Sequence, residues 1–515
     1  MQTMQHPQAV ADWLRSRVQG DLQCDSRRMQ AGDGFVAWPG AATDGRRFAT
    51  GALRAGAAAV LVEQAGVEAF GFSDERVLAV PGLKALAGPI ASAYFGNPSS
   101  QLDLIAITGT NGKTSTAWWV GQLLSAAGQP CAVVGTLGIG QPPLAGDTGH
   151  ALVSTGLTTP DPVLLQARLR GMVDVGVKAC AVEASSIGLV EGRLNGSRIR
   201  VAVFTNFTQD HLDFHGSMDS YWSAKAALFD WPDLASAVVN LDDPRGAPLA
   251  ATLGARGMDV WSVGIEEAGK TKPARLFAQD IGFTDHGMRL VVGERSGDGA
   301  LIESHILSLP LVGRYNVSNL LCVLAVARAQ GVALADAVQA CGALTPVPGR
   351  MEQVPGAHPG QPLVLVDYAH TPDALEKALQ ALQPLAQQRG GQLWAVVGCG
   401  GDRDASKRPI MAAVAECGAQ HTVLTSDNPR SEDPQAILAQ MQAGLTQPGA
   451  AHVEPDRATA IAWAVHTAQV HDVVLIAGKG HEDYQEVMGV KKPFSDLAQA
   501  QTALMQRAVA PGATT

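Results

Sequence analysis

The clearest chemistry lies in residues 108–116 (TGTNGKTST), a glycine-rich run that follows the apolar stretch 104–107 (LIAI). In such a loop the backbone N–H groups, together with the N-terminus of the helix that follows, bind phosphate oxygens. Lys113 is placed to reach the β- and γ-phosphates of a nucleotide, and Thr114 to place its hydroxyl on Mg²⁺. A strict GxxxxGK[ST] pattern fails because Ile107 stands where its first glycine belongs. The shorter core still predicts a nucleotide-phosphate site.

Acidic and imidazole groups follow two further apolar stretches. Glu183 comes directly after residues 179–182, and Asp210 and His211 come after residues 201–208. Mg²⁺ takes hard oxygen ligands, and metal sites of this kind tolerate imidazole. Because each group follows a predicted strand in the same block as the glycine-rich loop, the sequence predicts a metal site beside the phosphates.

The elements that must position these groups fall into three blocks, which is the number expected for 515 residues at roughly 150 residues per domain. Turn-rich segments at residues 96–100 (GNPSS) and 345–349 (TPVPG) read as linkers. We therefore predict domains at residues 1–98, 99–345 and 346–515.

Short apolar runs alternate with helical stretches in all three blocks. The predicted strands are 35–38, 58–62 and 77–80 in the first block, 104–107, 132–134, 179–182, 201–204 and 237–239 in the second, and 363–366, 393–397, 422–424 and 473–476 in the third. The predicted helices are 48–55, 161–171, 219–229 and 317–330. This pattern is typical of α/β folds with parallel sheets buried on both faces. Such sheets bind ligands outside the carboxyl ends of their strands.

Composition excludes several classes of function. Lysine and arginine number 38 against 48 aspartates and glutamates, so the formal net charge is −10, which argues against a nucleic-acid or polybasic membrane binder. No apolar run reaches the roughly 18 residues of a membrane span, and the N-terminus has no secretory signal pattern. The seven cysteines are scattered, without a CxxC pair, as in a cytoplasmic protein with reduced thiols.

Further motifs, in order along the chain, resemble those of the Mur ligases, the ATP-dependent amide-bond-forming enzymes of peptidoglycan synthesis. The matching segments are 109–114 (GTNGKT), 183–186 (EASS), 205–213 (TNFTQDHLD), 313–319 (GRYNVSN), 348–352 (PGRME), 367–373 (DYAHTPD) and 478–482 (GKGHE). The resemblance covers nearly the whole chain. It implies a small N-terminal α/β domain that binds the UDP-substrate, a central P-loop domain that binds ATP, and a C-terminal Rossmann-like domain that binds the amino acid.

The resemblance also implies the reaction. ATP phosphorylates the D-Glu carboxylate of UDP-MurNAc-L-Ala-D-Glu to an acyl phosphate, which an incoming amine attacks. Residues 401–404 (GDRD) and 427–430 (DNPR) resemble those of members that add meso-2,6-diaminopimelate. We expect ATP as co-substrate, Mg²⁺ as cofactor, and a cytoplasmic, monomeric enzyme without nucleic-acid partners or membrane insertion.

The choice of amino acid has a physical basis. Diaminopimelate differs from lysine by a second carboxylate at its far end, and Arg403 and Arg430 offer planar donors that suit a carboxylate. Each such charge-assisted bond is worth roughly 1.5–3 kcal/mol. A site built to bind a polar group of its substrate discriminates against an analogue that lacks the group by a factor of roughly 10⁴–10⁵ in kcat/KM. Glu482 is available to meet the distal ammonium group.

Other site residues are implied by the resemblance alone. The expected catalytic residues are Lys113, Lys225 and His211, and the expected metal ligands are Thr114, Glu183, His211 and Lys225 as its carbamate. The ATP contacts are Gly109, Thr110, Asn111, Gly112, Lys113, Thr114, Ser115, Asn316 and Arg350, with Asp367 and His370 at an ATP-side hinge. The UDP-MurNAc-dipeptide contacts are Ser26, Thr158, Thr159, Ser185 and Arg193, and the runs 25–27 (DSR) and 44–46 (DGR) resemble the uridine-nucleotide portion. The diaminopimelate contacts are Arg403, Asp427, Asn428, Arg430, Gly478 and Glu482.

Two positions depart from the family pattern. Ile187 stands where close relatives have histidine and cannot donate a hydrogen bond, and Glu191 replaces a glutamine and adds negative charge near an anionic substrate. These two changes favour one alternative, a catalytically silent nucleotide-binding scaffold. A second alternative, independent of them, is an L-lysine-adding or folylpolyglutamate-type ligase of the same fold.

Overall fold

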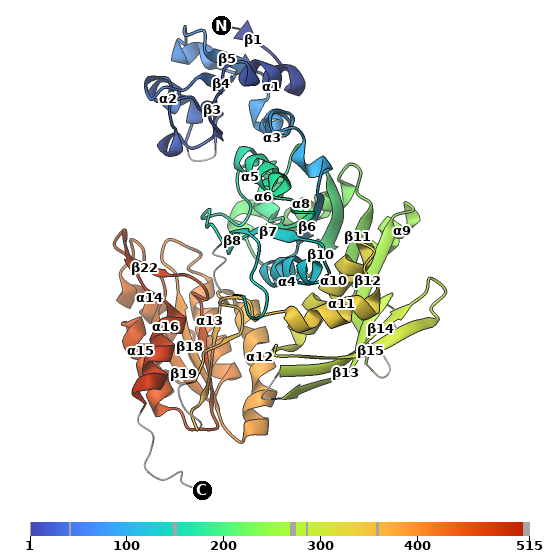
Figure 1. The fold of residues 1–515 in the computed structure, drawn as a ribbon. Helices are drawn as coiled ribbons and strands as arrows, with labels where there is room; N and C mark the ends of the chain where they lie inside the picture. Colours follow the sequence, from blue (N-terminus) through green and yellow to red (C-terminus); the bar gives the residue numbers. More distant parts are fainter. Residues whose placement is uncertain are drawn as a thin grey trace. The chain divides into compact units, whose positions relative to one another are not determined.

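The computed structural model describes residues 2–40, 43–147, 152–267, 274–284, 287–356 and 360–507. The chain forms two compact units, each of which is coloured along the sequence in Figure 1. The first unit comprises Met1–Phe207, Phe214–Val263 and Cys322–Ala343, and the second comprises Thr208–Asp213, Gly264–Leu321 and Leu344–Thr515. Both units contain parallel sheets with covering helices, so the predicted α/β class is confirmed.

A five-stranded parallel sheet opens the first unit. Its strands are β1 (Gln2–Thr3), β2 (Leu22–Gln23), β3 (Gly34–Ala37), β4 (Ala59–Glu63) and β5 (Val77–Val80), in the order β1-β5-β4-β3-β2. The accompanying helices are α1 (Pro7–Arg15), α2 (Ala49–Arg54) and α3 (Leu83–Tyr94). Leu61 faces one hydrophobic core while Val60 and Val62 face another, because both faces of the sheet are buried.

A second parallel sheet forms the centre of the first unit. Its strands are β6 (Asp103–Thr108), β7 (Cys131–Gly135), β8 (Gly138–Gly140), β9 (Ala179–Glu183), β10 (Ile199–Phe204), β11 (Ser236–Asn240) and β12 (Asp259–Ile265). Their order is β12-β11-β10-β6-β9-β7-β8, and only β7 and β8 pair antiparallel. The helices are α4 (Lys113–Ala126), α5 (Pro162–Asp174), α6 (Ser186–Val190), α7 (Leu212–His215), α8 (Met218–Ala226), α9 (Gly246–Ala255) and α11 (Leu334–Ala340). The predicted strands of this block are confirmed.

Three antiparallel strands of the second unit were not predicted. They are β13 (Leu276–Thr284), β14 (Gly287–Arg295) and β15 (Leu301–Leu309), and each pairs with the next along the chain. In β15, exposed and half-buried residues fill most positions, and only Leu307 and Leu309 are buried. The strand signal used for the other sheets was a continuous apolar run, which a strand with one solvated face does not provide.

The second unit also holds a six-stranded sheet. Its strands are β16 (Glu352–Gln353), β17 (Leu363–Asp367), β18 (Leu393–Cys399), β19 (His421–Ser426), β20 (His452–Val453) and β21 (Val473–Ala477), in the order β16-β17-β21-β18-β19-β20. The helices are α12 (Pro372–Arg389), α13 (Lys407–Gly418), α14 (Pro434–Gln442), α15 (Arg457–Thr467) and α16 (Asp496–Gln506). The strands β22 (Tyr484–Val487) and β23 (Val490–Pro493) form a hairpin. The chain passes from the second unit to the first within α10 (Arg314–Ala329). The four predicted strands of this block are confirmed.

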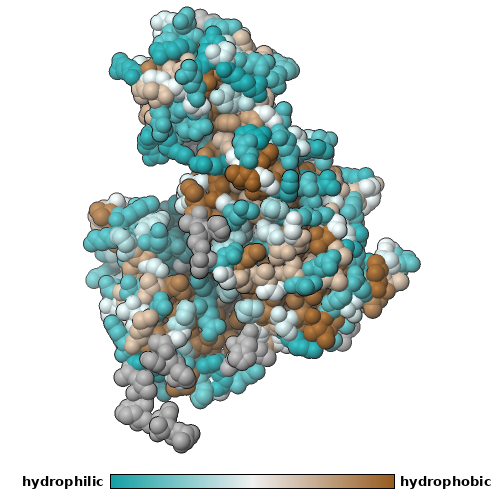
Figure 2. All heavy atoms as spheres, viewed as in Figure 1, coloured by the Kyte–Doolittle hydropathy of each residue, from teal (hydrophilic) through white to brown (hydrophobic). Residues whose placement is uncertain are grey.

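The surface is mixed in polarity. Hydrophilic side chains cover much of the face drawn in Figure 2, with hydrophobic ones scattered between them. Within the described residues, no helix is both long and apolar enough to span a membrane. All seven cysteines carry free thiols; five are buried, Cys24 is half-buried and Cys417 is exposed.

Candidate active site

The glycine-rich loop connects β6 to α4, as the sequence predicts. Gly109 has a φ of +149°, and a Cβ there would lie 1.9 Å from Oγ1 of Thr205, so the loop admits only glycine at this point. Gly112, with a φ of +83°, caps the N-terminus of α4, which begins at Lys113. The backbone amides of the loop and the start of the helix therefore lie together, as a phosphate site requires.

Two residues after β10 brace this loop, and sequence reasoning did not select them individually. The backbone N–H of Asn111 donates to Oδ1 of Asn206 at 2.8 Å, and Nδ2 of Asn206 donates to the carbonyl of Asn111 at 3.0 Å. The hydroxyl of Thr205 donates to the same carbonyl at 2.6 Å. Because β10 pairs with β6, the residues that follow each strand meet at one edge of the sheet. Both residues lie in the run 205–213, which is the sequence signal from which they could have been selected.

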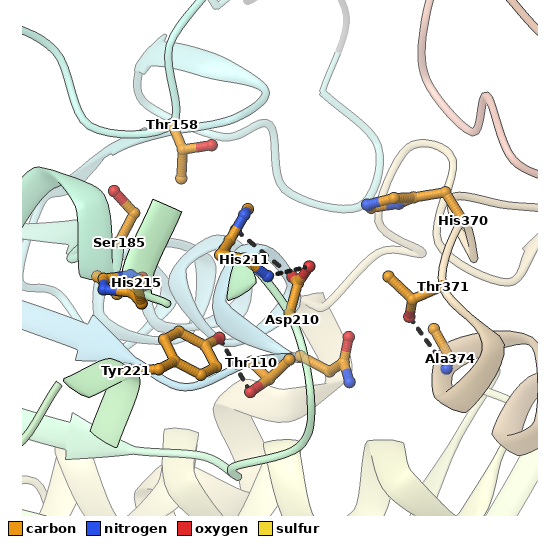
Figure 3. Close-up of polar contacts among 12 residues, drawn as sticks. Thr110, Thr158, Ser185, Asp210, His211, His215, Tyr221, His370, Thr371 and Ala374 are labelled. Carbon is orange, nitrogen blue, oxygen red and sulfur yellow. Dashed lines mark hydrogen bonds and ion pairs between the residues drawn. The ribbon is translucent and has the colours of Figure 1, made fainter. Parts of the chain in front are cut away.

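The side chains of the loop are held inward. Nζ of Lys113 donates to the carbonyls of Gly109 and Thr110, both at 2.9 Å. The hydroxyl of Thr110 lies 3.1 Å from that of Tyr221 on α8, a contact drawn in Figure 3. Thr114 and Ser115 are buried in the first turn of α4. The loop residues predicted to bind ATP phosphates thus lie together, in the loop after β6 and the first turn of α4.

Glu183, at the end of β9, contacts the loop directly. Its Oε2 accepts from the hydroxyl of Thr114 at 3.0 Å, and its Oε1 accepts from the backbone N–H of Thr136 at 2.7 Å. The carboxylate is 1% exposed. Mg²⁺ in nucleotide sites is held by one or two carboxylates together with substrate phosphates, so the two oxygens of this contact fit the predicted cation. No group of three or more histidine, cysteine or acidic side chains in the described part of the chain has the arrangement of a metal centre.

Lys225 reaches the same loop from α8. The residue is 1% exposed, and its Nζ donates to the carbonyl of Gly109 at 2.7 Å and lies 4.5 Å from the centre of the Tyr221 ring. The lysine is therefore internal and adjacent to the phosphate loop. Burial of an ammonium group in this way is expensive, which is unusual for a lysine on a short surface helix.

Four of the predicted dipeptide contacts lie together. The hydroxyl of Thr159 donates to the carbonyl of Glu183 at 2.6 Å and lies 2.9 Å from Oγ of Ser185. Arg193 donates to the carbonyl of Thr159 at 2.8 Å. Thr158, which Figure 3 shows above Ser185, lies 3.1 Å from the hydroxyl of Thr136, a neighbour of Glu183. This cluster is continuous with the predicted metal contacts.

The fifth predicted dipeptide contact, Ser26, lies in a short 3₁₀ helix between β2 and β3. The flanking Asp25 and Arg27 pair with each other at 2.7 Å, and Asp44 and Arg46 repeat this arrangement at 2.7 Å. Arg46 is buried and also donates to the carbonyl of Ala65 at 2.5 Å. Both Asp-x-Arg runs are therefore folded as local turns. Within the described residues, no hydrogen bond joins Ser26 to the other four dipeptide contacts.

The two departures from the family pattern have local partners. Glu191 forms an ion pair with Lys84 at 2.8 Å, so its negative charge is offset. Ile187 is half-buried on α6, and the preceding Ser186 lies 3.0 Å from Nε2 of His215. An imidazole is therefore present beside this helix, on a residue that sequence reasoning did not single out.

His211 belongs to the second unit, whereas Glu183 and Lys225 belong to the first. Its backbone has a φ of +51°, its N–H donates to Oδ1 of Asp210 at 2.9 Å, and its Nε2 lies 3.4 Å from Oδ2 of the same carboxylate. Figure 3 draws this pair. The side chain is 43% exposed. The predicted metal role of His211 stays a prediction.

The remaining predicted ATP contacts also lie in the second unit. Nδ2 of Asn316 donates to the carbonyl of Val312 at 2.7 Å at the start of α10. The guanidinium of Arg350 lies 4.2 Å from the centre of the Tyr368 ring. Asp367 ends β17, and its Oδ2 accepts from the N–H of Met351 at 2.7 Å. Burial raises the pKa of Asp367, while the charge of Arg350 acts in the opposite direction.

His370 follows β17 in the predicted hinge. Its Nδ1 lies 2.8 Å from the carbonyl of Tyr368. Burial lowers the pKa of His370, and the positive charge of Lys407 lowers it further.

The two arginines predicted to bind the distal carboxylate border one spot in the second unit. A Cβ placed on Gly400 would lie 2.8 Å from Nη1 of Arg430 and 3.8 Å from Cγ of Arg403. Arg430 has a φ of +53°, and its Nη1 donates to the carbonyl of Gly401 at 2.6 Å. Gly401 in turn donates to the carbonyl of Asn428 at 2.9 Å, which joins the loops after β18 and β19.

Arg403 differs from Arg430 in the contacts that its side chain makes. Its side chain is exposed, and it makes no hydrogen bond or ion pair with the part of the chain that the structure describes. The adjacent loop is nonetheless fixed, because Oδ1 of Asp402 accepts from the hydroxyl of Ser431 at 2.7 Å and the N–H of Asp402 donates to Glu432 at 2.6 Å. Arg403 is therefore a guanidinium on an anchored loop, available to an anion.

The loop after β19 is anchored by a second arginine, Arg408, which is 1% exposed. Its Nη2 donates to Oε1 of Glu432 at 2.8 Å and to the carbonyl of Gly400 at 3.2 Å. The hydrogen bond from Arg408 is the largest of the causes that lower the pKa of Glu432 to about 2. The pair holds the two loops together at physiological pH.

Asn428, Glu482 and Lys479 form a polar cluster on the loops after β19 and β21, within the predicted amino-acid pocket. Nδ2 of Asn428 donates to Oε2 of Glu482 at 2.7 Å, and Nζ of Lys479 donates to Oδ1 of Asn428 at 3.1 Å and to Oε2 of Glu482 at 3.0 Å. Lys479 is fully buried and was not among the predicted site residues. Its place between two glycines directly after β21 was the available signal.

Asp427 and Gly478 lie side by side on the loops after β19 and β21. Gly478 has a φ of +118°, and a Cβ there would lie 2.6 Å from Oδ2 of Asp427, so the position favours glycine. Asp427 accepts from the N–H of Asn428 at 2.6 Å. All six predicted diaminopimelate contacts therefore lie on the three loops that follow β18, β19 and β21.

Curated proteins similar to this chain include a UDP-N-acetylmuramoyl-L-alanyl-D-glutamate–2,6-diaminopimelate ligase from Acidovorax sp. (strain JS42), which is 55% identical over 514 residues, covering 98% of this chain and 99% of the relative. A protein of the same name from Pseudomonas aeruginosa is 44% identical over 498 residues, covering 97% of this chain and 96% of the relative. Both similarities extend over nearly the whole of each chain.

Solved structures give the same result. A structure of a UDP-N-acetylmuramoyl-L-alanyl-D-glutamate–2,6-diaminopimelate ligase has a TM-score of 0.63 at 35% identity, with 94% of each chain covered. A D-alanyl-D-alanyl-adding ligase from Acinetobacter baumannii, at 19% identity, has a TM-score of 0.64 and shares the fold, with 92% of this chain and 95% of that chain covered. Family models also match the chain: Mur ligase family, catalytic domain at 21–94, Mur ligase middle domain at 107–327, and Mur ligase, glutamate ligase domain at 349–480. The chain belongs to the Mur ligase family.

Proposed function

We propose that the chain is an ATP-dependent ligase that joins meso-2,6-diaminopimelate to the D-Glu carboxylate of UDP-MurNAc-L-Ala-D-Glu in peptidoglycan precursor synthesis. Relatives that carry the name of this activity are 43–55% identical over nearly the whole chain. The single observation that carries the amino-acid choice is the pair Arg403 and Arg430 around Gly400. Nη1 of Arg430 and Cγ of Arg403 both lie near Gly400, and two arginine side chains that start from one place suit a carboxylate that lysine lacks.

The phosphate end of the reaction is assigned to the loop after β6. Its amides and Lys113 bind the β- and γ-phosphates of ATP, with Asn316 and Arg350 as further nucleotide contacts. Thr114 and Glu183, already joined at 3.0 Å, hold Mg²⁺, with His211 as a further ligand. When bound, Mg²⁺ offsets the negative charge of the phosphates.

Lys225 is assigned as a carbamate. Its uncharged amine adds CO₂, forming an N–C bond and releasing one proton, and the product presents two oxygens in place of an ammonium group. The carbamate nitrogen keeps one N–H, so the contact with the Gly109 carbonyl at 2.7 Å has a donor in either form. The internal position of Lys225 beside the phosphate loop supports this role.

The substrates are held by the remaining clusters. Ser26, Thr158, Thr159, Ser185 and Arg193 bind the UDP-MurNAc-dipeptide and orient its D-Glu carboxylate. Arg403 and Arg430 hold the distal carboxylate of diaminopimelate, and Asp427, Asn428, Gly478 and Glu482 contact its distal amino end. With both reactants anionic, positioning and electrostatic stabilisation supply most of the catalysis.

Phosphate release tests the function. Purified protein with ATP, Mg²⁺, UDP-MurNAc-L-Ala-D-Glu and diaminopimelate is expected to release phosphate and form the tripeptide product, which mass spectrometry identifies. Lys113→Ala is the matched control, because it removes the phosphate-binding ammonium at the loop. Release no faster than in this control would refute the ligase and favour a catalytically silent scaffold.

A competition assay tests the amino-acid choice. Diaminopimelate and L-lysine are offered together, and the ratio of their kcat/KM values is measured. A large preference for diaminopimelate supports the arginine pair, and equal values would refute it. L-glutamate with a folate acceptor is the arm for the folylpolyglutamate-type alternative.

The enzyme is further proposed to act as a monomer in the cytoplasm, with domains at residues 1–98, 99–345 and 346–515. The free thiols of all seven cysteines support a reducing compartment. The three matched ranges 21–94, 107–327 and 349–480 support this division into domains.

A further inference from the structure

A buried ion pair beneath the amino-acid pocket is not used by the chemistry described above. Arg457 begins α15 and Asp496 begins α16, and both side chains are fully buried. Nε of Arg457 donates to Oδ1 of Asp496 and Nη2 donates to Oδ2, both at 2.7 Å. The pair is therefore bidentate, which fixes the orientation of the guanidinium plane.

The remaining donors of this guanidinium reach two strand ends. Nη1 of Arg457 donates to the carbonyl of Ser426 at 3.2 Å, and Nη2 donates to the carbonyl of Ala477 at 3.0 Å. Ser426 is the last residue of β19, and Ala477 is the last residue of β21. These strands are not neighbours, because β18 lies between them. One side chain thus links the carboxyl ends of two strands that share no backbone hydrogen bond.

The next residues along each strand belong to the pocket. Asp427 and Asn428 follow Ser426, and Gly478 and Lys479 follow Ala477. The two loops meet where Lys479 donates to Asn428 at 3.1 Å, and Glu482 accepts from both. A change in the separation of the two strand ends would therefore change the geometry of this cluster.

The charge of Arg457 acts on the same cluster. Burial lowers the pKa of Arg457, but the carboxylates of Asp496, Asp427 and Glu482 more than offset this and raise it. The cation is therefore permanent, and it faces acidic side chains on the helix and on both pocket loops.

We propose that Arg457 is a positioning residue for the amino-acid substrate: by clamping the carboxyl ends of β19 and β21, it sets the spacing of the loops that carry Asn428 and Glu482. This inference rests on the proposed assignment of Asn428 and Glu482 to diaminopimelate. Because the Arg457 and Asp496 side chains are fully buried, the clamp acts through the loops after β19 and β21, so its effect is on affinity for the amino acid and not on ATP.

Two variants test the clamp. Arg457→Lys keeps a cation beside Asp496 but lacks the planar fork that reaches both carbonyls. The double variant Arg457→Met with Asp496→Leu removes both charges, a change that proteins often tolerate in a buried pair. For both we expect KM for diaminopimelate to rise about 10-fold or more, since small misplacements of binding groups are costly. KM for ATP and for UDP-MurNAc-L-Ala-D-Glu should stay within about 2-fold.

A matched control exists at the other end of the same two helices. Nη1 of Arg507, just after α16, donates to the carbonyl of Val465 in α15 at 2.6 Å. Arg507→Ala removes a contact between these helices without touching the strand ends. It should leave all three KM values unchanged, and its thermal midpoint serves as the stability reference for the clamp variants.

The outcomes separate the clamp from the pocket assignment. Unchanged KM for diaminopimelate in a folded clamp variant, or an equal rise in all three KM values, would overturn the positioning role. Failure of both variants to fold would overturn it in favour of a purely structural role. Asn428→Ala is measured in parallel: if it too leaves KM for diaminopimelate unchanged, the proposed pocket itself is wrong.

Discussion

At the scale of single residues, the two arginines of the proposed amino-acid pocket have different surroundings. Arg430 is tied to the carbonyl of Gly401 at 2.6 Å, whereas Arg403 is exposed and has no partner among the described residues. A tied guanidinium loses little freedom when it binds a carboxylate, and an untied one loses more. We therefore expect Arg430 to supply the larger share of the affinity.

Substitution of Arg430 tests this difference. Arg430→Ala should raise KM for diaminopimelate about 10- to 100-fold, which corresponds to the roughly 1.5–3 kcal/mol of a charge-assisted bond. KM for ATP should be almost unchanged. Steady-state kinetics with each substrate varied in turn provides the measurement, with Arg403→Ala alongside. Comparable rises for ATP and diaminopimelate in Arg430→Ala would contradict the assigned role.

Substitution of Lys225 tests its proposed role as a metal ligand. Lys225→Ala should lower kcat about 100-fold, the scale of losing one preorganised electrostatic group. Short carboxylic acids such as acetate should restore part of the activity, because they return oxygens to the space of the carbamate. Lys178→Ala, at an exposed lysine, is the control. Full activity in Lys225→Ala would exclude the lysine from the metal site.

We expect His481 to make the free energy of unfolding depend on pH. Burial, with the charges of Arg350 and Lys479, lowers its pKa to about 3, and its buried Nδ1 has no hydrogen-bond partner among the described residues. The unfolded chain, with a histidine pKa near 6.5, binds the proton first as pH falls. The free energy of unfolding should therefore be fully retained above about pH 6.5 and fall by up to about 1.4 kcal/mol per pH unit toward pH 3.

The variant His481→Asn lacks this titration. Urea unfolding at several pH values between 6.5 and 4.5 should give a shallower pH dependence for His481→Asn than for the wild-type chain. Identical slopes for the two proteins would mean that the pKa of His481 is the same in the folded and unfolded states.

At the scale of elements, the phosphate loop depends on one glycine. A methyl group at Gly109 would meet Oγ1 of Thr205 at 1.9 Å, and the φ of +149° disfavours any side chain. Gly109→Ala should raise KM for ATP at least about 10-fold and lower the thermal midpoint, since overpacking costs about 1–3 kcal/mol. Differential scanning fluorimetry and ATP titration provide the measurements.

The matched control for this glycine is Gly171 on α5, where a Cβ would meet nothing within 4 Å. Gly171→Ala should raise the midpoint slightly, because alanine favours a helix by about 0.5–1 kcal/mol over glycine. A Gly109→Ala protein that binds ATP like the wild-type chain would show that the loop relaxes around the methyl group.

The strands differ in how well their positions could be predicted from the sequence. Strands buried on both faces, such as β5 and β21, are continuous apolar runs, and their predicted ranges agree with the structure to within a residue. The strand β15 has one exposed face and was missed. Asn206 and Lys479 lie inside two of the quoted motifs, 205–213 and 478–482, but their contacts join loops that are far apart in the sequence, and periodicity does not encode such contacts.

At the scale of the whole molecule, the first unit joins its two sheets through a close backbone contact. A Cβ on Gly88 of α3 would lie 2.0 Å from the carbonyl of Asn195, and one on Gly196 would lie 2.5 Å from the nitrogen of Pro89. The ion pair of Lys84 with Glu191 lies beside this contact. The N-terminal sheet is therefore attached to the cluster of predicted dipeptide contacts through α3.

Gly88→Val should loosen this attachment. We expect KM for UDP-MurNAc-L-Ala-D-Glu to rise about 10-fold, because Ser26 and the dipeptide contacts would no longer hold a fixed separation. KM for ATP should be nearly unaffected. Gly51→Ala, at an open position on α2, is the control, and wild-type kinetics in Gly88→Val would show that the contact is not needed for substrate binding.

The cysteines described in the fold have a practical consequence. Burial raises the pKa of Cys131 and of Cys399 to about 12, so these thiols rarely ionise near neutral pH. Only thiolates react rapidly with alkylating reagents. Cys417, exposed at the end of α13, thus offers a native attachment point for a fluorescent dye on the second unit, with no engineered residue required.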